Sequence, residues 1–244
     1  MEVLQLAFAM ALAAIHLFAG KLHRLDTLPR SAWLSFAGGF SVGYVFIHIF
    51  PELNAAHRAI SDHGVLGLLE HNAYIVALLG LAYFYGLEHW VKRRSRKPTI
   101  ASTGTKRVEN QKSVFWVHVV AFAIYNALFG YLLVYRNTQL PSELFFFLAM
   151  GFHFLVNDYG LASHHRSLYA TQGRWILAAA IVAGWAVGVL VEVAEAVTSL
   201  VYAFVAGGLI LNVLKEELPE QRCSRFLAVC SGGLFACTLL LTFA

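Results

Sequence analysis

Charged residues are scarce in this sequence of 244 residues. Asp, Glu, Lys and Arg make up 13% of it, against about 25% in a typical soluble domain, whereas 59% of the residues are hydrophobic and the mean hydropathy is +0.63. This balance excludes a large soluble domain and predicts an integral membrane protein. With roughly 20 residues per span, the length accommodates at most about eight transmembrane helices.

Cysteine is also rare. Cys223, Cys230 and Cys237 are spaced by seven residues, so they share one face of the last predicted helix and cannot bridge one another, and no Cys-x-x-Cys pair is present. The pattern excludes a disulfide framework. The first residues lack the basic segment and the cleavage site of a secretory signal, so the first apolar run is expected to remain as a helix.

Eight apolar runs predict eight transmembrane helices and an all-α polytopic membrane fold. The division at Glu192 and Glu195 rests on two acidic residues and on the length of the combined run, which exceeds one span. The predicted helices cover residues 2–20, 32–53, 70–91, 114–135, 141–164, 173–193, 197–217 and 224–243.

The basic residues predict the orientation of these helices. When alternate loops are assigned to alternate sides, 16 of the 18 Lys and Arg residues fall on one side, and only Arg58 and Arg136 fall on the other. The positive-inside rule therefore places the loop 92–113 in the cytoplasm and both termini outside. Because topology accounts for the basic pI of about 9.0, no nucleic-acid partner is expected.

The loop 92–113 is the only long polar segment predicted on the cytoplasmic side. Its Arg-Arg-Ser-Arg-Lys-Pro and Ser-Thr-Gly-Thr stretches are typical of disorder. We interpret the loop as a topogenic charge cluster, with contact to anionic lipid headgroups as the alternative. The predicted organisation is residues 1–91 with three helices, the loop 92–113, two central helices in 114–165, and three more helices in 166–244.

Polar residues within one apolar run mark the candidate site. The stretch 151–160 places His153, Asn157 and Asp158 inside a predicted span, where ionisable groups are costly and usually mark an ion or substrate path. His153 and Asn157 are four residues apart and share a helix face, and Asn126 lies near the centre of the preceding helix. The alternative is that His153 and Asn157 are satisfied inside the bundle, while Asp158 reaches water near the membrane surface.

Two predicted helices resemble each other in opposite orientations. The second contains Ala-Gly-Gly at 37–39 and Pro51, and the seventh contains Ala-Gly-Gly at 206–208 and Pro219. The first glycine precedes the proline by 13 residues in one helix and by 12 in the other. This pattern predicts an inverted repeat that relates helices one to three to helices six to eight and leaves helices four and five as a central pair.

The chain resembles the ZIP family of divalent-metal transporters. The resemblance rests on the predicted eight helices, the external termini, the long loop after the third helix, the three-two-three arrangement, and the His48-x-x-Pro51-Glu52 end of the second helix. It implies a metal site between helices four and five. It also implies alternating access, in which helices one, four, five and six carry this site past the remaining helices.

The metal motifs of the family are incomplete in this chain. In helix four, Tyr125 and Phe129 stand where the family has a His and an acid, and in helix five Phe154 and Asn157 replace polar ligands. The resemblance therefore implies one weak site, because zinc prefers His, Cys and carboxylate ligands. The implied metal ligands are His153, Asn126, Asn157 and Asp158, and His48, Glu52, His164 and His165 are candidates for the entrance or exit.

The predicted function is transport of a divalent metal cation, zinc or a similar ion, with no enzymatic activity and no organic cofactor. The expected partners are the lipid bilayer and the metal ion, and a homodimer is left open. One alternative is a ZIP-derived protein that has lost transport and has a structural or sensing role. Another is a haem or metal-dependent membrane enzyme that uses histidines such as His16 and His118, although only His164-His165 approaches a clustered motif.

Overall fold

The computed structural model describes residues 2–19, 30–62, 72–96, 104–135, 140–164, 166–217 and 226–243. These ranges are helical except for the connection 191–194, and they contain no strand, which confirms the predicted all-α class. Three short π-helical segments, η2 to η4, continue neighbouring α-helices. The elements are α1 (Glu2–Ala19), α2 (Arg30–Tyr44), η2 (Val45–Ile49), α3 (Phe50–Asp62), α4 (Asn72–Arg96), α5 (Gly104–Tyr135), α6 (Leu140–His164), α7 (Arg166–Leu168), η3 (Tyr169–Gly173), α8 (Arg174–Leu190), α9 (Glu195–Asn212), η4 (Val213–Glu217) and α10 (Phe226–Phe243).

Several helices are suited to a bilayer by length and composition. Four segments are long and apolar enough to cross it, namely 35–61, 112–135, 166–190 and 195–215. The helices Val3–Ala19 and Phe226–Leu241 are apolar but shorter. Large hydrophobic side chains such as Leu78, Val120 and Leu227 are exposed, as expected for surfaces that face lipid rather than water.

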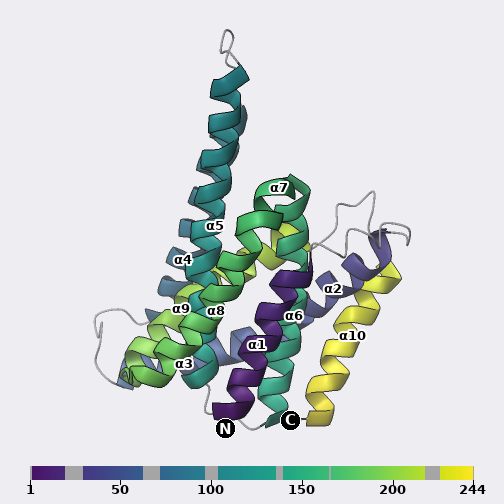
Figure 1. The fold of residues 1–244 in the computed structure, drawn as a ribbon. Coiled ribbons are helices and arrows are strands. Elements are labelled where there is room, and N and C mark those ends of the chain that lie inside the picture. The colour runs from purple at the N-terminus through teal and green to yellow at the C-terminus, as the bar shows by residue number, and fades with distance from the viewer. Residues whose placement is uncertain are drawn as a thin grey trace.

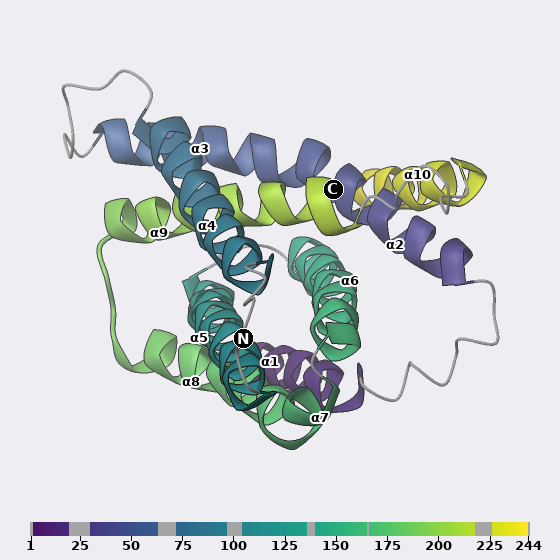
Figure 2. The same ribbon diagram turned by 90° about the horizontal axis from the view of Figure 1, so that it is seen from above.

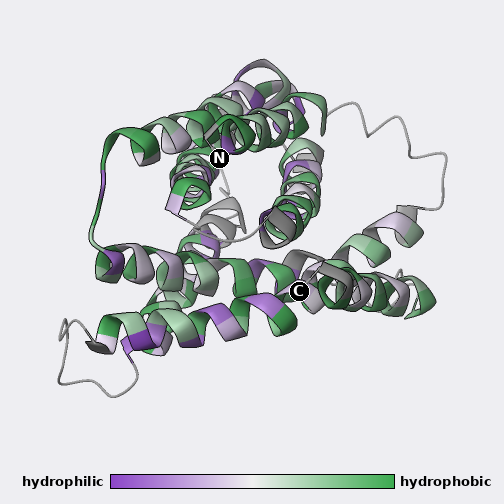
Figure 3. Ribbon diagram, turned by 90° about the horizontal axis from the view of Figure 1, so that it is seen from below, coloured by the Kyte–Doolittle hydropathy of each residue, from purple (hydrophilic) through white to green (hydrophobic). Residues whose placement is uncertain are grey.

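The helices pack in two layers, which Figure 2 shows from one end of the molecule. The first layer contains α2, α3, α4, α9 and α10, in which α10 packs on α2 and both α3 and α4 pack on α9. The second layer contains α1, α5, α6 and α8, in which α1 and α5 pack on α8 and α6 packs on α1. Hydrophobic residues predominate along the helices of both layers (Figure 3).

The chain ends and the middle of the chain lie at opposite ends of the molecule (Figure 1). Helix α1 begins and helix α10 ends at the same end. Helix α4 ends and helix α5 begins at the other end, where both extend beyond the remaining helices. The two ends of the bundle are therefore distinct, and the last turn of α4 and the first turn of α5 belong to the end that is remote from the termini.

Reciprocal glycines allow three pairs of helices to pack with their backbones in contact. A Cβ atom on any of these glycines would lie only 1.8–2.1 Å from a backbone carbonyl oxygen of the facing helix. Such close approach is the usual role of small residues between membrane helices. The pairs are α5 and α8 at Gly130 and Gly184, α2 and α10 at Gly39 and Gly232, and α4 and α9 at Gly80 and Gly207.

The predicted break between the sixth and seventh apolar runs is confirmed. Helix α8 ends at Leu190 and α9 begins at Glu195. The Tyr135 hydroxyl donates a hydrogen bond to the Val191 carbonyl and accepts one from the Val193 N–H at 3.2 Å. These bonds satisfy backbone groups that the break leaves without helical partners.

Helical structure extends further into the segment 92–113 than the sequence predicted. Helix α4 continues to Arg96, and α5 begins at Gly104, ten residues before the predicted start at 114. Disorder was predicted for residues 93–98 and 102–105, and this prediction is wrong for residues 93–96 and 104–105, which are helical. The stretch 106–112 consists largely of Lys, Arg, Glu and Gln, which are good helix formers even when they are not buried.

The backbone contacts at the paired glycines predict that two Gly→Ala substitutions differ in their effect on stability. Gly184→Ala should lower the stability by about 1–3 kcal/mol, because its Cβ would overlap the Ala127 carbonyl oxygen 1.9 Å away. Gly86→Ala is the matched control, since nothing lies within 4 Å of its added Cβ. Thermal unfolding of the purified protein in detergent measures both, and equal melting temperatures would contradict the proposed backbone contact.

Candidate cation site

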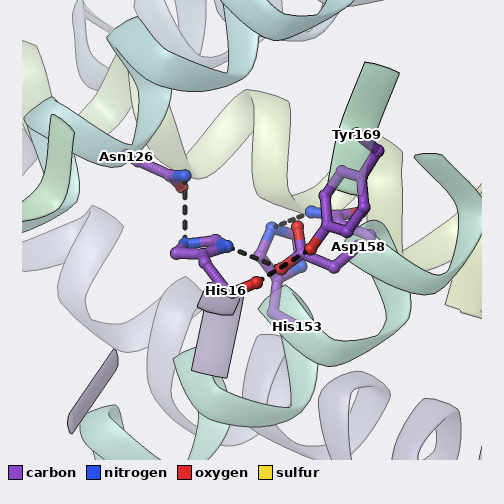
Figure 4. Close-up of polar contacts among 6 residues, drawn as sticks. His16, Asn126, His153, Asp158 and Tyr169 are labelled. Atoms are coloured by element: carbon purple, nitrogen blue, oxygen red, sulfur yellow. Dashed lines mark hydrogen bonds and ion pairs between the residues drawn. The ribbon is translucent and has the colours of Figure 1, made fainter. Parts of the chain in front are cut away.

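A buried polar cluster joins three helices of the second layer (Figure 4). His16 comes from α1, Asn126 from α5 and Asp158 from α6, and each is at most 3% exposed. His16 Nδ1 lies 2.7 Å from Asp158 Oδ2, and His16 Nε2 lies 3.2 Å from Asn126 Nδ2. The two ring nitrogens of one histidine therefore connect the other two side chains.

The hydrogen bonds are consistent with one arrangement of protons. The amide nitrogen of Asn126 can only donate, so His16 Nε2 accepts and carries a lone pair. Nδ1 then carries the proton and donates it to the carboxylate of Asp158. In this arrangement one ring nitrogen of His16 donates to Asp158 and the other accepts from Asn126.

Tyr169 holds the end of α1 in place. Its hydroxyl donates to the backbone carbonyl of His16 at 3.0 Å, and its side chain is 1% exposed. His16 lies in the last turn of α1, where carbonyl groups have no helical N–H partner. Tyr169 belongs to the π-helical segment η3, so this short element positions the histidine of the cluster.

A small cavity lies beside the cluster. Its volume is about 10 Å³, which is close to the minimum for a single water molecule. Polar lining is supplied by His16, Asn126, Asn157 and Asp158, and apolar lining by side chains that include Phe122 and Leu177. The cavity therefore has the size and the polar groups to hold one small species.

A second chain of hydrogen bonds runs from the first layer into the site. Asn212 Nδ2 of α9 donates to Asn157 Oδ1 at 2.6 Å, and Asn157 Nδ2 donates to His153 Nε2 at 3.0 Å. His153 is 1% exposed, and its ring packs near Tyr125 and Phe129. Asn157 thus lines the cavity, while His153 lies one hydrogen bond behind it.

The structure brings together three of the four predicted metal ligands around one cavity. These are Asn126, Asn157 and Asp158, with His153 joined to them through Asn157. The alternative that Asp158 reaches water near the membrane surface is wrong, because Asp158 is 1% exposed. Asp158 pairs with His16. Residue spacing in the sequence does not reveal this pair, because the two residues belong to different helices.

Of the residues predicted to form the entrance or exit, the structure describes the side chains of His48 and Glu52. His48 Nε2 lies 3.1 Å from Glu52 Oε1, one helical turn further along the chain. The ring of His48 packs beside Tyr44 and Phe145. The side chain of His164 and the whole of His165 lie outside the described residues.

Sequence reasoning missed the site roles of His16, Tyr169 and Asn212. His16 carried a usable signal, because it is an ionisable residue inside an apolar run, where such residues are usually functional. Asn212 carried the same signal more weakly, as an amide near the end of another apolar run. Tyr169 carried none, since tyrosine is common at membrane interfaces.

The cluster contains one histidine and one carboxylate. Among the described residues, no group of three or more His, Cys, Asp or Glu side chains could hold a metal ion. Comparison with protein-family models, curated proteins and solved structures finds no match to this chain. The chemistry of the site must therefore be inferred from its own geometry.

The His16–Asp158 pair predicts non-additive effects of substitution. His16→Leu should destabilise the protein by about 3–5 kcal/mol, because it leaves a buried carboxylate without its partner. The double variant His16→Leu with Asp158→Leu should be more stable than His16→Leu alone, because both polar groups are removed together. Thermal unfolding tests this, with the exposed His89→Leu as the control, and additive losses would contradict the pairing.

Proposed function

We propose that this protein is a membrane transporter of a small divalent metal cation, zinc or a similar ion, and that it works in a ZIP-like manner. The observation that carries the proposal is the buried His16–Asp158–Asn126 cluster beside a cavity of about 10 Å³. An ionisable cluster in a bundle of apolar helices is costly and usually marks an ion path. The ligands that we propose are His16 and Asn126, with Asn157 as a further candidate and Asp158 as the carboxylate that orients His16.

The proton arrangement favours a cation over an anion. Asp158 supplies one negative charge, and His16 Nε2 supplies a lone pair that faces Asn126. Metal-binding histidines commonly donate their other ring N–H to a carboxylate, which orients the ring and makes the free nitrogen more basic. His16 has this partner in Asp158, so it is oriented as a ligand before any metal arrives.

The spacing of the cluster suits a shared ion. If the Asn126 amide turned over, its oxygen would replace the nitrogen that now lies 3.2 Å from His16 Nε2. Two ligand atoms at that separation can both reach one zinc ion at about 2.0–2.2 Å. Asn157 is a weaker candidate, because its oxygen already accepts a hydrogen bond from Asn212.

The donor set predicts weak binding. One carboxylate and one neutral histidine leave part of a 2+ charge uncompensated in a medium of low dielectric constant. A site that releases its ion during each cycle tolerates such weakness, because conduction requires the ion to leave as well as to enter. The same weakness favours transport over a structural metal site.

Matching π-helical segments support the inverted repeat. Segment η2 ends two residues before Pro51, and η4 ends two residues before Pro219. Proline lacks an N–H, and its ring clashes with the carbonyl four residues earlier in an α-helix. The wider π turn η2 relieves this clash before Pro51, and η4 lies at the equivalent place in the sequence before Pro219.

The positions of two glycines that contact a neighbouring helix support the same inverted repeat. Gly39 and Gly207 each lie 12 residues before the proline of their helix, and each faces a backbone carbonyl of a neighbouring helix. The neighbour is α10 in the first case and α4 in the second. A two-fold relation between helices one to three and helices six to eight pairs α2 with α9 and α10 with α4, so the α2–α10 contact corresponds to the α9–α4 contact.

Alternating access is supported by where the site lies relative to the layers. His16, Asn126 and Asp158 all belong to helices of the second layer, which corresponds to predicted helices one, four, five and six. Movement of this layer as a unit would carry the cluster without dismantling it. The Asn212–Asn157 hydrogen bond crosses between the layers, so it would have to break during such a movement.

The proposed topology predicts opposite labelling of two positions. In a variant whose three cysteines are replaced by Ser, Arg58→Cys should react with an impermeant maleimide from outside intact cells, and Arg93→Cys should react only after permeabilisation. Both side chains are exposed, on α3 and α4 respectively. Reaction of both positions from the same side would contradict the eight-span topology.

Metal uptake into proteoliposomes tests the function directly. Asp158→Asn and His16→Gln should each raise the half-saturation concentration for zinc about ten- to a hundredfold, since His16→Gln removes the ligand and Asp158→Asn removes the charged hydrogen-bond partner that orients it, worth roughly 1.5–3 kcal/mol. His153→Gln should have a smaller effect, because His153 lies behind the cavity lining. The exposed His89→Gln is the control that should leave uptake unchanged.

Two outcomes would overturn parts of the proposal. Background flux of all first-row divalent ions through the wild type would reject transport and favour the structural or sensing role, for which the depleted donor set is the supporting observation. A greater increase in the half-saturation concentration with His153→Gln than with His16→Gln would instead indicate that His153, as predicted from the sequence, is the histidine ligand.

A further inference from the structure

An apolar groove opens between α4 and α5 on the outside of the bundle. Its volume is about 310 Å³. The aromatic rings of Tyr83 and Trp116 line it together with aliphatic side chains that include Val120, Ala121 and Ile124. Tyr83, Val120 and Ile124 are each more than half exposed, so no other described part of the chain covers the groove.

The groove exists because its two walls belong to different layers. Helix α4 packs closely on α9 through Gly80, and α5 packs closely on α8 through Gly130. Each wall is therefore held by a neighbour on its far side, and the two helices make much less contact with each other. Side chains of α4 and α5 that face the groove therefore remain exposed and do not pack against each other.

Basic residues mark the end of this groove that is remote from the termini. Lys112 is exposed and lies one helical turn before Trp116 on α5, and Arg94 lies seven residues, about two turns, beyond Leu87 on α4. Between residues 92 and 112 the sequence contains eight Lys and Arg residues and one acid, Glu109. A cluster of four to eight basic residues at the end of a membrane helix is typical of anionic-lipid binding.

We propose that the groove binds an anionic phospholipid of the surrounding bilayer. One acyl chain lies against Val120, Ala121 and Ile124, and the phosphate lies near Lys112. Trp116, one helical turn beyond Lys112, lies between these two parts, at the level where aromatic side chains favour the membrane interface. The charge of the groove's end selects an anionic headgroup over a zwitterionic one.

This lipid would contact both layers at once. Its acyl chain lies between α4 of the first layer and α5 of the second, so its occupancy opposes any change in their separation. The inference depends on membrane insertion alone and stands whether or not the protein transports a metal.

Native mass spectrometry of the protein, released from nanodiscs of equal parts phosphatidylglycerol and phosphatidylcholine, tests the proposal. The wild type should retain phosphatidylglycerol in preference to phosphatidylcholine. Lys112→Gln should weaken this retention about fivefold, at roughly 1 kcal/mol per basic residue. Ala121→Trp should reduce retention by filling the groove.

Two matched variants control for general effects of charge and bulk. Arg58→Gln removes an exposed basic residue from α3, and Leu234→Trp adds bulk to an exposed, apolar position on α10. Both should retain phosphatidylglycerol as the wild type does. Equal retention of the two lipids by the wild type, or unchanged retention in both groove variants, would overturn the proposal.

Discussion

A carboxylate buried among apolar helices needs a partner, and the arrangement around Asp158 follows from that requirement. His16 supplies the partner at 2.7 Å, which draws the end of α1 against α6. The pairing also determines which ring nitrogen carries the proton, and so leaves His16 Nε2 to face Asn126. Breaking such a pair costs several kcal/mol, so the geometry of the site and the packing of three helices depend on one another.

The second organising constraint is close contact between helix backbones. In three helix pairs a glycine on each member faces a carbonyl of the other, and these pairs make each layer a tightly packed unit. The α1–α6 contact differs, because a Cβ on Gly151 would meet the end of the Ile15 side chain rather than a backbone atom. Polar bonds such as Asn212–Asn157 then connect the layers, and the exposed groove between α4 and α5 marks where they separate.

The extent of successful prediction differs between fold and site. Apolar runs and the acids Glu192 and Glu195 located the helices well, because hydrophobic length and helix breaks are local properties of the chain. Residues 93–96 and 104–105 belong to stretches that were predicted to be disordered, but they are helical, because polar composition and helix propensity conflict there. For the site, Asn126, Asn157 and Asp158 were predicted to lie together and do line one cavity, whereas His16 was missed because it is 142 residues from Asp158 in the chain.

The sequence by itself determined that this protein is helical and suited to a membrane, and it determined which polar residues lie inside apolar runs. Composition and spacing suffice for these features because each depends on neighbours within one helix. Only the tertiary structure decided which polar groups meet, that His16 and not His153 is the partner of Asp158, and that Asn157 is held by Asn212. These contacts depend on how helices cross, and the crossings are set by backbone contacts between segments that are distant in sequence.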